Sequence, residues 1–492
     1  MDATANAITI GRDAAGKSCS LIPSMANRHG LIAGATGTGK TVTLQLLAEG
    51  FSSIGVPVFT ADVKGDLSGI AAAGALTPKL QERLAAAGFA APAFAPSPVL
   101  FWDLYGANGH PVHTTLGDVG PLLLSRMLDL NETQAQVLQL AFTIADNEGL
   151  LLLDTKDLRA LLGWIGEHAS ELRTEYGNFA PATIGAIQRA LLALDEAGGS
   201  ILFGEPALQL PHLLQRDFSG RGVINILDAA RLLHDARLYS TFLLWLLSEL
   251  FEELDEVGDA DKPRLVFFFD EAHLLFKDTP RVLLEKIEQV VRLIRSKGVG
   301  VFFVTQNPLD IPPPILGQLG NRVQHALRAF TPADQKAVRA AAQTLRANPA
   351  LDTAEAITQL GVGEALVSTL DAEGRPAPVE RVMIAPPAGK IGPLDPAVRG
   401  ELTARSPLAG VYDMMLDRES AFELLQKRRA ERPAAEAGTT RREDSIWDSI
   451  FKSSSRRQSP AEAFVKSTLR SVGSAVGREI VRGVLGSLSR RR

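Results

Sequence analysis

Short runs of consecutive apolar residues alternate with longer stretches of helical periodicity along most of the chain. We predict strands at 30–33, 56–61, 98–103, 222–227, 264–269 and 300–305. Runs that are apolar on both faces are typical of central strands in a parallel sheet covered by helices on both sides. The alternation of such strands with helices predicts an α/β fold with a mainly parallel sheet.

The pattern changes over 119–215, where Leu and Ala recur at helical spacing and β-branched runs are few. This stretch predicts a helical insertion that divides the strand–helix core into 31–118 and 216–390. The short N-terminal segment 1–30 contains an expected edge strand at 8–12. We further expect a strand within 322–330, and a hairpin formed by 364–370 and 379–384 at the end of the core.

The C-terminal part has a different composition. Residues 391–460 predict a partly disordered linker, since Gly and Pro are followed by a stretch rich in Arg, Ser, Ala and Glu. Over 461–492, apolar residues recur every three or four positions with Lys and Arg off that stripe, which predicts a basic amphipathic C-terminal helix. Docking on a neighbouring subunit, binding to a membrane surface and direct DNA contact remain its three alternative roles.

Length and composition narrow the class of protein. A chain of 492 residues with 46% hydrophobic residues can form two or three domains with a large core. The single cysteine, Cys19, excludes an intramolecular disulfide framework and suits a reducing compartment. Without a secretory signal pattern or a run of about 20 apolar residues, the sequence predicts a cytoplasmic protein with no membrane span.

Charge is distributed unevenly along the chain. From Lys427 onward there are roughly 16 Lys and Arg against 7 Asp and Glu, about +9, although the whole chain carries -5. The rest of the chain is therefore strongly acidic. A basic tail on an acidic body indicates an anionic partner or self-association, and a solvated disordered tail is the alternative.

The run from Gly34 to Thr41 fits G-x-x-x-x-G-K-[ST], the phosphate-binding loop of P-loop NTPases. Its glycines let successive backbone N–H groups point at a phosphate, and the following helix adds its N-terminal dipole. Lys40 would reach the β and γ phosphates of ATP, and the Thr41 hydroxyl would ligate Mg²⁺. The predicted nucleotide-binding residues of the loop are Gly34, Thr36, Gly37, Thr38, Gly39, Lys40, Thr41 and Val42.

A P-loop requires a metal-holding carboxylate at the end of a hydrophobic strand. Asp270 follows Phe267-Phe268-Phe269 and is the predicted Mg²⁺ ligand, while Glu271 is placed to act as general base on the attacking water. Several strand–helix units must separate Lys40 from Asp270. The adjacent hydrolytic glutamate favours an ATPase over a kinase, which has to exclude water from the γ-phosphate.

Two further polar residues end predicted strands. Gln306 ends the strand at 300–305, where its amide can contact the γ-phosphate or the attacking water, with a strand cap as the alternative. Asp62 ends the strand at 56–61 and is a second acidic candidate near the phosphates, with a turn-forming aspartate as the equal alternative.

Cations gather before the strand that leads to Gln306. Arg292, Arg295 and Lys297 lie at a predicted helix end, where positive charge also favours the helix dipole. The functional alternative is an arginine finger that reaches the ATP of a neighbouring subunit. A finger acting in trans requires a ring or a filament.

Together, Gly34–Thr41, Asp62-Val63-Lys64-Gly65-Asp66, Phe269-Asp270-Glu271-Ala272-His273 and Thr305-Gln306-Asn307-Pro308 resemble the HerA/FtsK superfamily of ring ATPases, in particular HerA-like bacterial proteins of the YjgR type. This resemblance implies a RecA-like core, a homo-hexamer and ATP-driven translocation on double-stranded DNA. It assigns the trans finger to Arg295, the metal carboxylate to Asp270, the catalytic carboxylate to Glu271 and the sensor to Gln306. HerA translocases carry a β-barrel before the P-loop that contacts a nuclease partner. With the loop at Gly34, we expect no such barrel, and the resemblance therefore does not extend to the nuclease partner.

Three functions compete on this basis. The first is a hexameric ATPase that moves DNA, for which the acidic body offers no obvious basic loop. The second is an ATPase that acts on an unidentified protein partner, or that changes its assembly state with nucleotide. The third is a small-molecule kinase, against which Glu271 and Arg295 argue.

Overall fold

The computed structural model describes residues 6–436 except 178, 233–235, 259, 278 and 280. The C-terminal helix predicted at 461–492 and the part of the predicted linker beyond 436 lie outside the described residues. Within them, a twelve-stranded sheet has the order β2-β1-β12-β11-β10-β3-β9-β8-β4-β7-β5-β6. The strands are β1 (Ile8–Arg12), β2 (Ser18–Leu21), β3 (Gly30–Ala33), β4 (Val58–Asp62), β5 (Val99–Asp103), β6 (His110–Pro111), β7 (Ile224–Asp228), β8 (Leu265–Phe269), β9 (Val299–Thr305), β10 (Asn321–Gln324), β11 (Glu364–Ser368) and β12 (Glu380–Ile384).

The sheet is parallel from β10 through β6 and antiparallel from β2 to β10. The mainly parallel α/β sheet predicted from the apolar runs is confirmed. One detail of the prediction is wrong: residues 8–12 do not form the edge of the sheet, because β1 pairs with both β12 and β2. The short, half-polar β2 was not predicted, since it lacks an apolar run.

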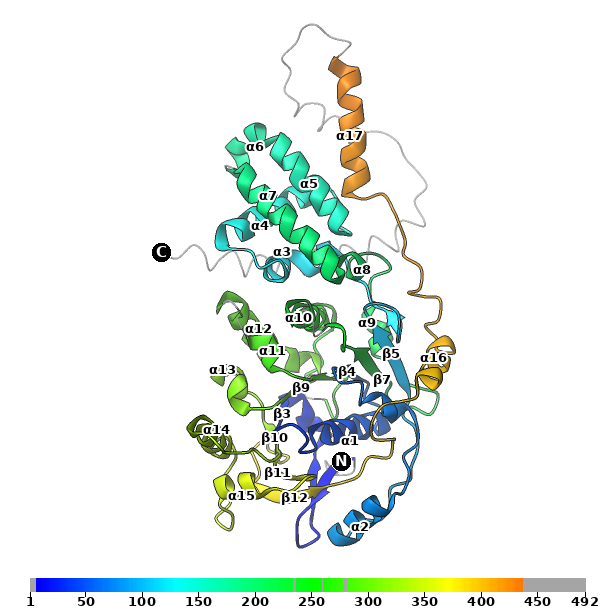
Figure 1. The fold of residues 1–492 in the computed structure, drawn as a ribbon, viewed down its shortest axis with the longest axis vertical. Helices are drawn as coiled ribbons and strands as arrows, with labels where there is room; N and C mark the ends of the chain where they lie inside the picture. The colour runs from blue at the N-terminus through cyan, green and yellow to red at the C-terminus, as the bar shows by residue number, and fades with distance from the viewer. Residues whose placement is uncertain are drawn as a thin grey trace.

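Helices cover both faces of the sheet and extend beyond it (Figure 1). They are α1 (Lys40–Ser53), α2 (Pro78–Ala87), α3 (Leu116–Met127), α4 (Glu132–Asn147), α5 (Thr155–Glu167), α6 (Ala169–Tyr176), α7 (Pro181–Leu194), α8 (Ser200–Leu202), α9 (Leu210–Leu213), α10 (Ala236–Glu253), α11 (His273–Phe276), α12 (Arg281–Leu293), α13 (Pro313–Leu316), α14 (Pro332–Gln343), α15 (Thr353–Gln359), α16 (Pro396–Ala404) and α17 (Ala421–Glu436). None of the described helices is both long and apolar enough to cross a membrane.

Successive side chains of a central strand point to opposite faces of the sheet, so the aromatic residues of the core are divided between the two faces. Phe268 lies 6.5 Å from Phe51 of α1, ring centroid to ring centroid, whereas its neighbour Phe269 stacks on Phe303 at 5.3 Å. Phe51 and Phe268 belong to one buried cluster, and Phe269 and Phe303 belong to another that includes α10. The fully apolar strands therefore hold a helix layer on each side.

Helices α3 to α8 form a group that stands on α10, away from the sheet (Figure 1). The apolar positions that predicted these helices, including Leu158, Leu161 and Ile165, are fully buried. They join the same cluster as the α10 face of the sheet, so the helical group and the sheet share one hydrophobic core.

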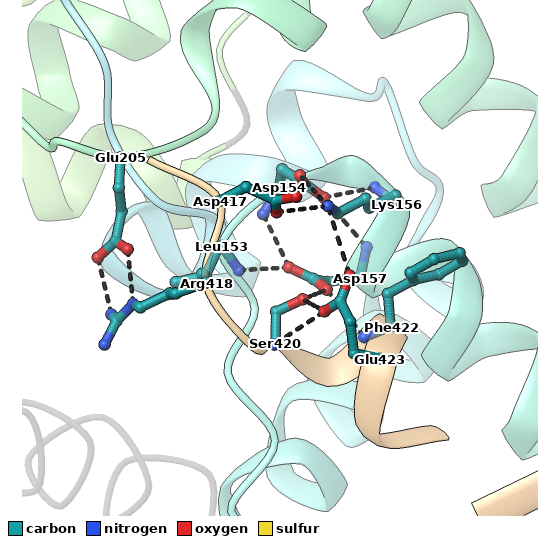
Figure 2. Close-up of polar contacts among 10 residues, drawn as sticks. All are labelled: Leu153, Asp154, Lys156, Asp157, Glu205, Asp417, Arg418, Ser420, Phe422 and Glu423. Carbon is teal, nitrogen blue, oxygen red and sulfur yellow. Dashed lines mark hydrogen bonds and ion pairs between the residues drawn. The ribbon is translucent and has the colours of Figure 1, made fainter. Parts of the chain in front are cut away.

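The described part of the predicted linker, residues 391–436, contains the two helices α16 and α17. We name residues 395–429 the C-terminal strap; it includes α16 beside β5 and the start of α17 against α5 (Figure 1). Arg418 donates two hydrogen bonds to the Glu205 carboxylate, at 2.6 and 2.7 Å, and Ser420 donates to Asp157 (Figure 2). The strap therefore connects the sheet edge to the helical group through polar contacts between residues far apart in the sequence. Such contacts could not be predicted from the local composition of the chain.

Candidate nucleotide-binding site

Four neighbouring parallel strands bring the predicted site residues to one edge of the sheet. The strands run in the order β3, β9, β8 and β4, and the carboxyl ends of parallel strands meet at the same edge. The glycine-rich loop follows β3, Gln306 follows β9, Asp270 follows β8 and Asp62 ends β4. Residues far apart in the chain, such as Thr36 and Gln306 at 270 positions from each other, therefore meet at this loop.

The loop has the backbone conformation expected of a phosphate cradle. Gly37 and Gly39 adopt φ of 78° and 118°, a region that side chains disfavour, and Gly39 precedes the first residue of α1, Lys40. Thr36 and Gly37 are exposed at the tip, and Thr41 and Val42 begin the helix half-buried. The N-terminus of α1 therefore lies directly after the loop. Its free N–H groups and the positive end of its dipole favour an anion at the loop.

Lys40 folds back over the loop. Its ammonium donates to the carbonyl oxygens of Gly34, at 2.7 Å, and Ala35, at 3.1 Å, while Thr38 Oγ1 donates to the Ala35 oxygen at 2.7 Å. Burial lowers the pKa of Lys40, opposed by the negative charge of Glu271. Phosphate oxygens would replace the two carbonyl partners with stronger, charged acceptors.

His325, which the sequence did not single out, supports the loop from below. A Cβ atom at position 34 would lie 2.5 Å from the His325 Cβ, so only glycine permits this approach. His325 Nδ1 donates to the Glu364 carbonyl at 3.0 Å, and its Nε2 accepts from the Thr43 hydroxyl at 2.9 Å. Burial lowers the pKa of His325 to about 4, which keeps the ring neutral. In the sequence, His325 follows the mostly polar stretch Asn321–Gln324, so no apolar run drew attention to it.

Asp270 lies deep at the carboxyl end of β8. Burial, followed by the charge of Glu271, raises the pKa of Asp270 to about 7. Its Oδ1 accepts from the Glu271 N–H at 2.9 Å, and Tyr239 donates to its backbone oxygen at 2.8 Å. A carboxylate that resists ionisation alone is suited to a cation partner, so the chemistry of Asp270 suits a Mg²⁺; Thr41, half-buried at the start of α1, is its predicted co-ligand.

Glu271 is held in an unusual backbone conformation. Its φ is 47°, a left-handed value that costs a non-glycine residue about 1–3 kcal/mol and is common at functional sites. Its carboxylate lies 3.4 Å from His273 Nδ1 and 3.4 Å from Lys64 Nζ. The His273 hydrogen bond and then the Lys64 charge hold the pKa of Glu271 at about 2, despite its burial. Glu271 is therefore fully ionised at neutral pH.

Gln306 connects this carboxylate to the loop. Its Nε2 lies 3.4 Å from both Glu271 carboxylate oxygens, and its Oε1 accepts from the Thr36 hydroxyl at 3.4 Å. An open hollow of about 450 Å³ lies beside them, lined by Ala35, Thr36, Gln306, Asn307, Leu327, Arg328, Asp334 and Ala337. The side chain thus contacts both halves of the predicted site.

Asp62 lies at this edge of the sheet, whereas Arg295 does not. The Asp62 carboxylate accepts from the N–H groups of Gly65, at 2.8 Å, and Leu67, at 3.0 Å, which is the turn-forming alternative. Burial raises its pKa to about 6. Arg295 lies in a 3₁₀ turn (Ile294–Lys297) before β9, so the seven residues of that strand separate it from Gln306 by roughly 23 Å. Within one chain, Arg295 is not brought to the other site residues.

The fold and the candidate site together define the class of protein. A largely parallel sheet with a glycine-rich loop after β3 and a carboxylate pair after β8, with β9 between these two strands, is the arrangement of RecA-like P-loop ATPases. Bacterial plasmid coupling protein TrwB shares the fold: its complexes with a non-hydrolysable GTP analogue and with ADP and Mg²⁺ each give a TM-score of 0.52 at 14% identity. Each alignment covers 77% of this chain and 90% of TrwB.

The family model described as helicase HerA-like C-terminal matches residues 7–492, and the chain belongs to this family. A probable helicase of Methanocaldococcus jannaschii is 30% identical over 125 residues, which are 25% of this chain and 22% of that protein. The DNA double-strand break repair helicase HerA of Sulfolobus acidocaldarius is 28% identical over 149 residues, 30% of this chain and 29% of that protein. The matched segments therefore span less than a third of either relative.

Proposed function

We propose that this protein hydrolyses ATP at the loop formed by Gly34–Thr41 and works as a cytoplasmic ring motor. The observation that carries the proposal is the contact of Gln306 with both the Glu271 carboxylate and the Thr36 hydroxyl, at 3.4 Å each. Because this contact joins Glu271 to the loop, it supports a hydrolytic role for the carboxylate. A kinase has to exclude water from the γ-phosphate, so a carboxylate that orients water at that position favours an ATPase.

Each residue has a defined role in this proposal. The loop N–H groups and Lys40 bind the β and γ phosphates, and Gln306 positions the γ-phosphate and the attacking water. Glu271 orients that water and accepts its proton as it attacks phosphorus. Mg²⁺, held by Thr41 and Asp270, would neutralise phosphate charge that the two carboxylates would otherwise repel.

The remote position of Arg295 supports a shared site. An arginine on the opposite edge of the sheet can reach only the nucleotide of a neighbouring subunit, so the proposal includes a homo-oligomeric ring, as a hexamer. Membership of the HerA-like family supports double-stranded DNA as the substrate that the ring moves. A DNA repair function is stated for the Sulfolobus acidocaldarius relative.

A protein substrate is the second candidate. The part of the chain before Lys427 is strongly acidic, which disfavours tight contact with DNA phosphates. The helical group α3–α8 offers a partner-binding element outside the sheet. In this alternative, nucleotide would drive a protein partner or change the assembly state without translocation on DNA.

ATP turnover measured with and without double-stranded DNA at low salt tests the proposal, alongside the mass of the particle in ATP. The ring motor requires Mg²⁺-dependent ATP hydrolysis, an oligomer, and stimulation by DNA that declines as salt rises. Hydrolysis that ignores DNA at low salt would favour the protein-directed alternative. A monomer in saturating ATP would exclude the ring.

A further inference from the structure

Lys64 lies beside the site and has no role in the function proposed above. Its ammonium is 3.4 Å from Glu271 Oε1, and its side chain is 46% exposed whereas that of Glu271 is only 9% exposed. The buried carboxylate is also held by His273 and Gln306. In this ion pair, the cation is therefore the partner that can move.

The backbone that carries Lys64 is fixed. The Asp62 carboxylate accepts from the N–H groups of Gly65 and Leu67, and Gly65 adopts a φ of 74°. Because the turn is held at both ends, movement is confined to the four-carbon stem of the lysine. The turn thus holds the Lys64 backbone beside β8, and only the ammonium group at the end of the side chain can change position.

That charge also acts on the phosphate loop. Lys64 contributes to lowering the pKa of Lys40, and it contributes to lowering the pKa of Glu271. It therefore lies within electrostatic reach of both the loop and the carboxylate. A γ-phosphate carries nearly two negative charges, so it attracts an ammonium more strongly than a single carboxylate at the same distance.

We propose that Lys64 is a positioning residue that makes Glu271 respond to the γ-phosphate. Without a triphosphate, the ammonium pairs with Glu271 and restrains it; a γ-phosphate draws the ammonium away and leaves Glu271 to orient the attacking water. ADP lacks the third phosphate and leaves the ion pair in place. This inference rests on the proposed ATP site and adds a means of distinguishing ATP from ADP.

An ordinary half-exposed ion pair is the competing explanation. Such pairs contribute little to stability and nothing to nucleotide discrimination. Nucleotide affinity separates the two explanations, since only the proposed role links Lys64 to the third phosphate.

The first experiment compares the dissociation constants of a non-hydrolysable ATP analogue and of ADP for the full chain with Mg²⁺. Lys64→Met should raise the dissociation constant of the ATP analogue by about 10-fold or more, which is the value of one charge-assisted contact. The dissociation constant of ADP should stay within about twofold of that of the unaltered protein. Lys64→Arg keeps the charge and should retain most of the discrimination. Lys79→Met, at an exposed position on α2, is the matched control and should change neither constant.

The second experiment uses Glu271→Gln. Removing the carboxylate frees Lys64 in the empty site, so the analogue should bind more tightly while ADP is unchanged. Combining it with Lys64→Met should abolish that gain. If the full gain persists in the double variant, the carboxylate simply repelled the γ-phosphate and the proposed role of Lys64 is wrong.

Failure of the inference is distinguishable from failure of the ATP site. The positioning role of Lys64 would be wrong if Lys64→Met weakened binding of the analogue and of ADP equally, or weakened neither. Either result would leave the proposed ATPase intact. Absence of binding of both nucleotides to the unaltered protein would instead overturn the ATP site itself. The unfolding temperature of each variant shows whether any loss of binding reflects loss of folding.

Discussion

Asp157 and Ser420 share a buried hydrogen bond of 2.5 Å across 263 positions of the chain (Figure 2). The same carboxylate accepts from the Phe422 N–H at 2.9 Å and, through its other oxygen, from the N–H groups of Leu153 and Asp154. Asp157 therefore caps the start of α5 and holds the C-terminal strap at once. One carboxylate links the helical group to the last described helix.

We expect Asp157→Ala to lower the free energy of unfolding by about 2–3 kcal/mol, because several buried donors lose their acceptor together. Ser420→Ala removes a single hydroxyl and should cost about 1 kcal/mol. Chemical denaturation followed by circular dichroism measures both. Glu196→Ala, at an exposed position in the same helical group, is the control. A loss from Asp157→Ala no larger than that of the control would show that the strap contact contributes nothing to stability.

Substitutions in the loop and in the carboxylate should separate binding from turnover. Lys40→Ala removes the ammonium that now contacts the Gly34 carbonyl and would bind the phosphates, so it should abolish detectable nucleotide binding. Glu271→Gln keeps the shape of the side chain but removes the base, so nucleotide still binds while turnover falls by about 10²–10⁴-fold. Calorimetric binding and phosphate release distinguish the two effects. Turnover near the unaltered rate in Glu271→Gln would exclude Glu271 as the general base.

The sequence predicted the strands that carry the site because uninterrupted apolar runs, such as that ending at Phe269, are a local signal. It also predicted that Gln306 and Asp270 would lie near the loop, since each ends a parallel strand. The contacts of Lys64 with Glu271 and of His325 with Thr43 could not be predicted. They depend on the order of strands across the sheet and on side-chain directions, which local periodicity does not encode.

His325 should make stability depend on pH. Its pKa is about 4 in the folded protein and about 6.5 when unfolded, so between these values the unfolded chain binds more protons. Its contribution is therefore fully present above about pH 6.5 and is lost as pH falls toward 4. The loss amounts to roughly 3 kcal/mol at most, at about 1.4 kcal/mol per pKa unit.

Two carboxyl groups near the site act in the opposite sense, so the test compares the unaltered protein with a variant of His325 at each pH. The raised pKa values of Asp62, about 6, and Asp270, about 7, give stability at low pH that is lost as pH rises through those values. We expect the unfolding free energies of the unaltered protein and His325→Gln to differ most at pH 7 and to converge by about pH 4. A difference that stays constant over pH 4–7 would show that His325 does not titrate as its burial requires.

The assignment of Arg295 to a neighbouring subunit's nucleotide predicts complementation. Arg295→Ala should keep nucleotide affinity and the oligomer but lose most hydrolysis, because the finger contributes about 10³–10⁵ in rate. When Arg295→Ala and Glu271→Gln subunits are mixed, some interfaces combine an intact Glu271 with an intact Arg295. ATP turnover of the mixture should therefore exceed that of either variant alone. Arg292→Ala, on the neighbouring exposed helix end, is the control and should hydrolyse normally. Additive activities in the mixture, with a normal oligomer, would place Arg295 outside the shared site.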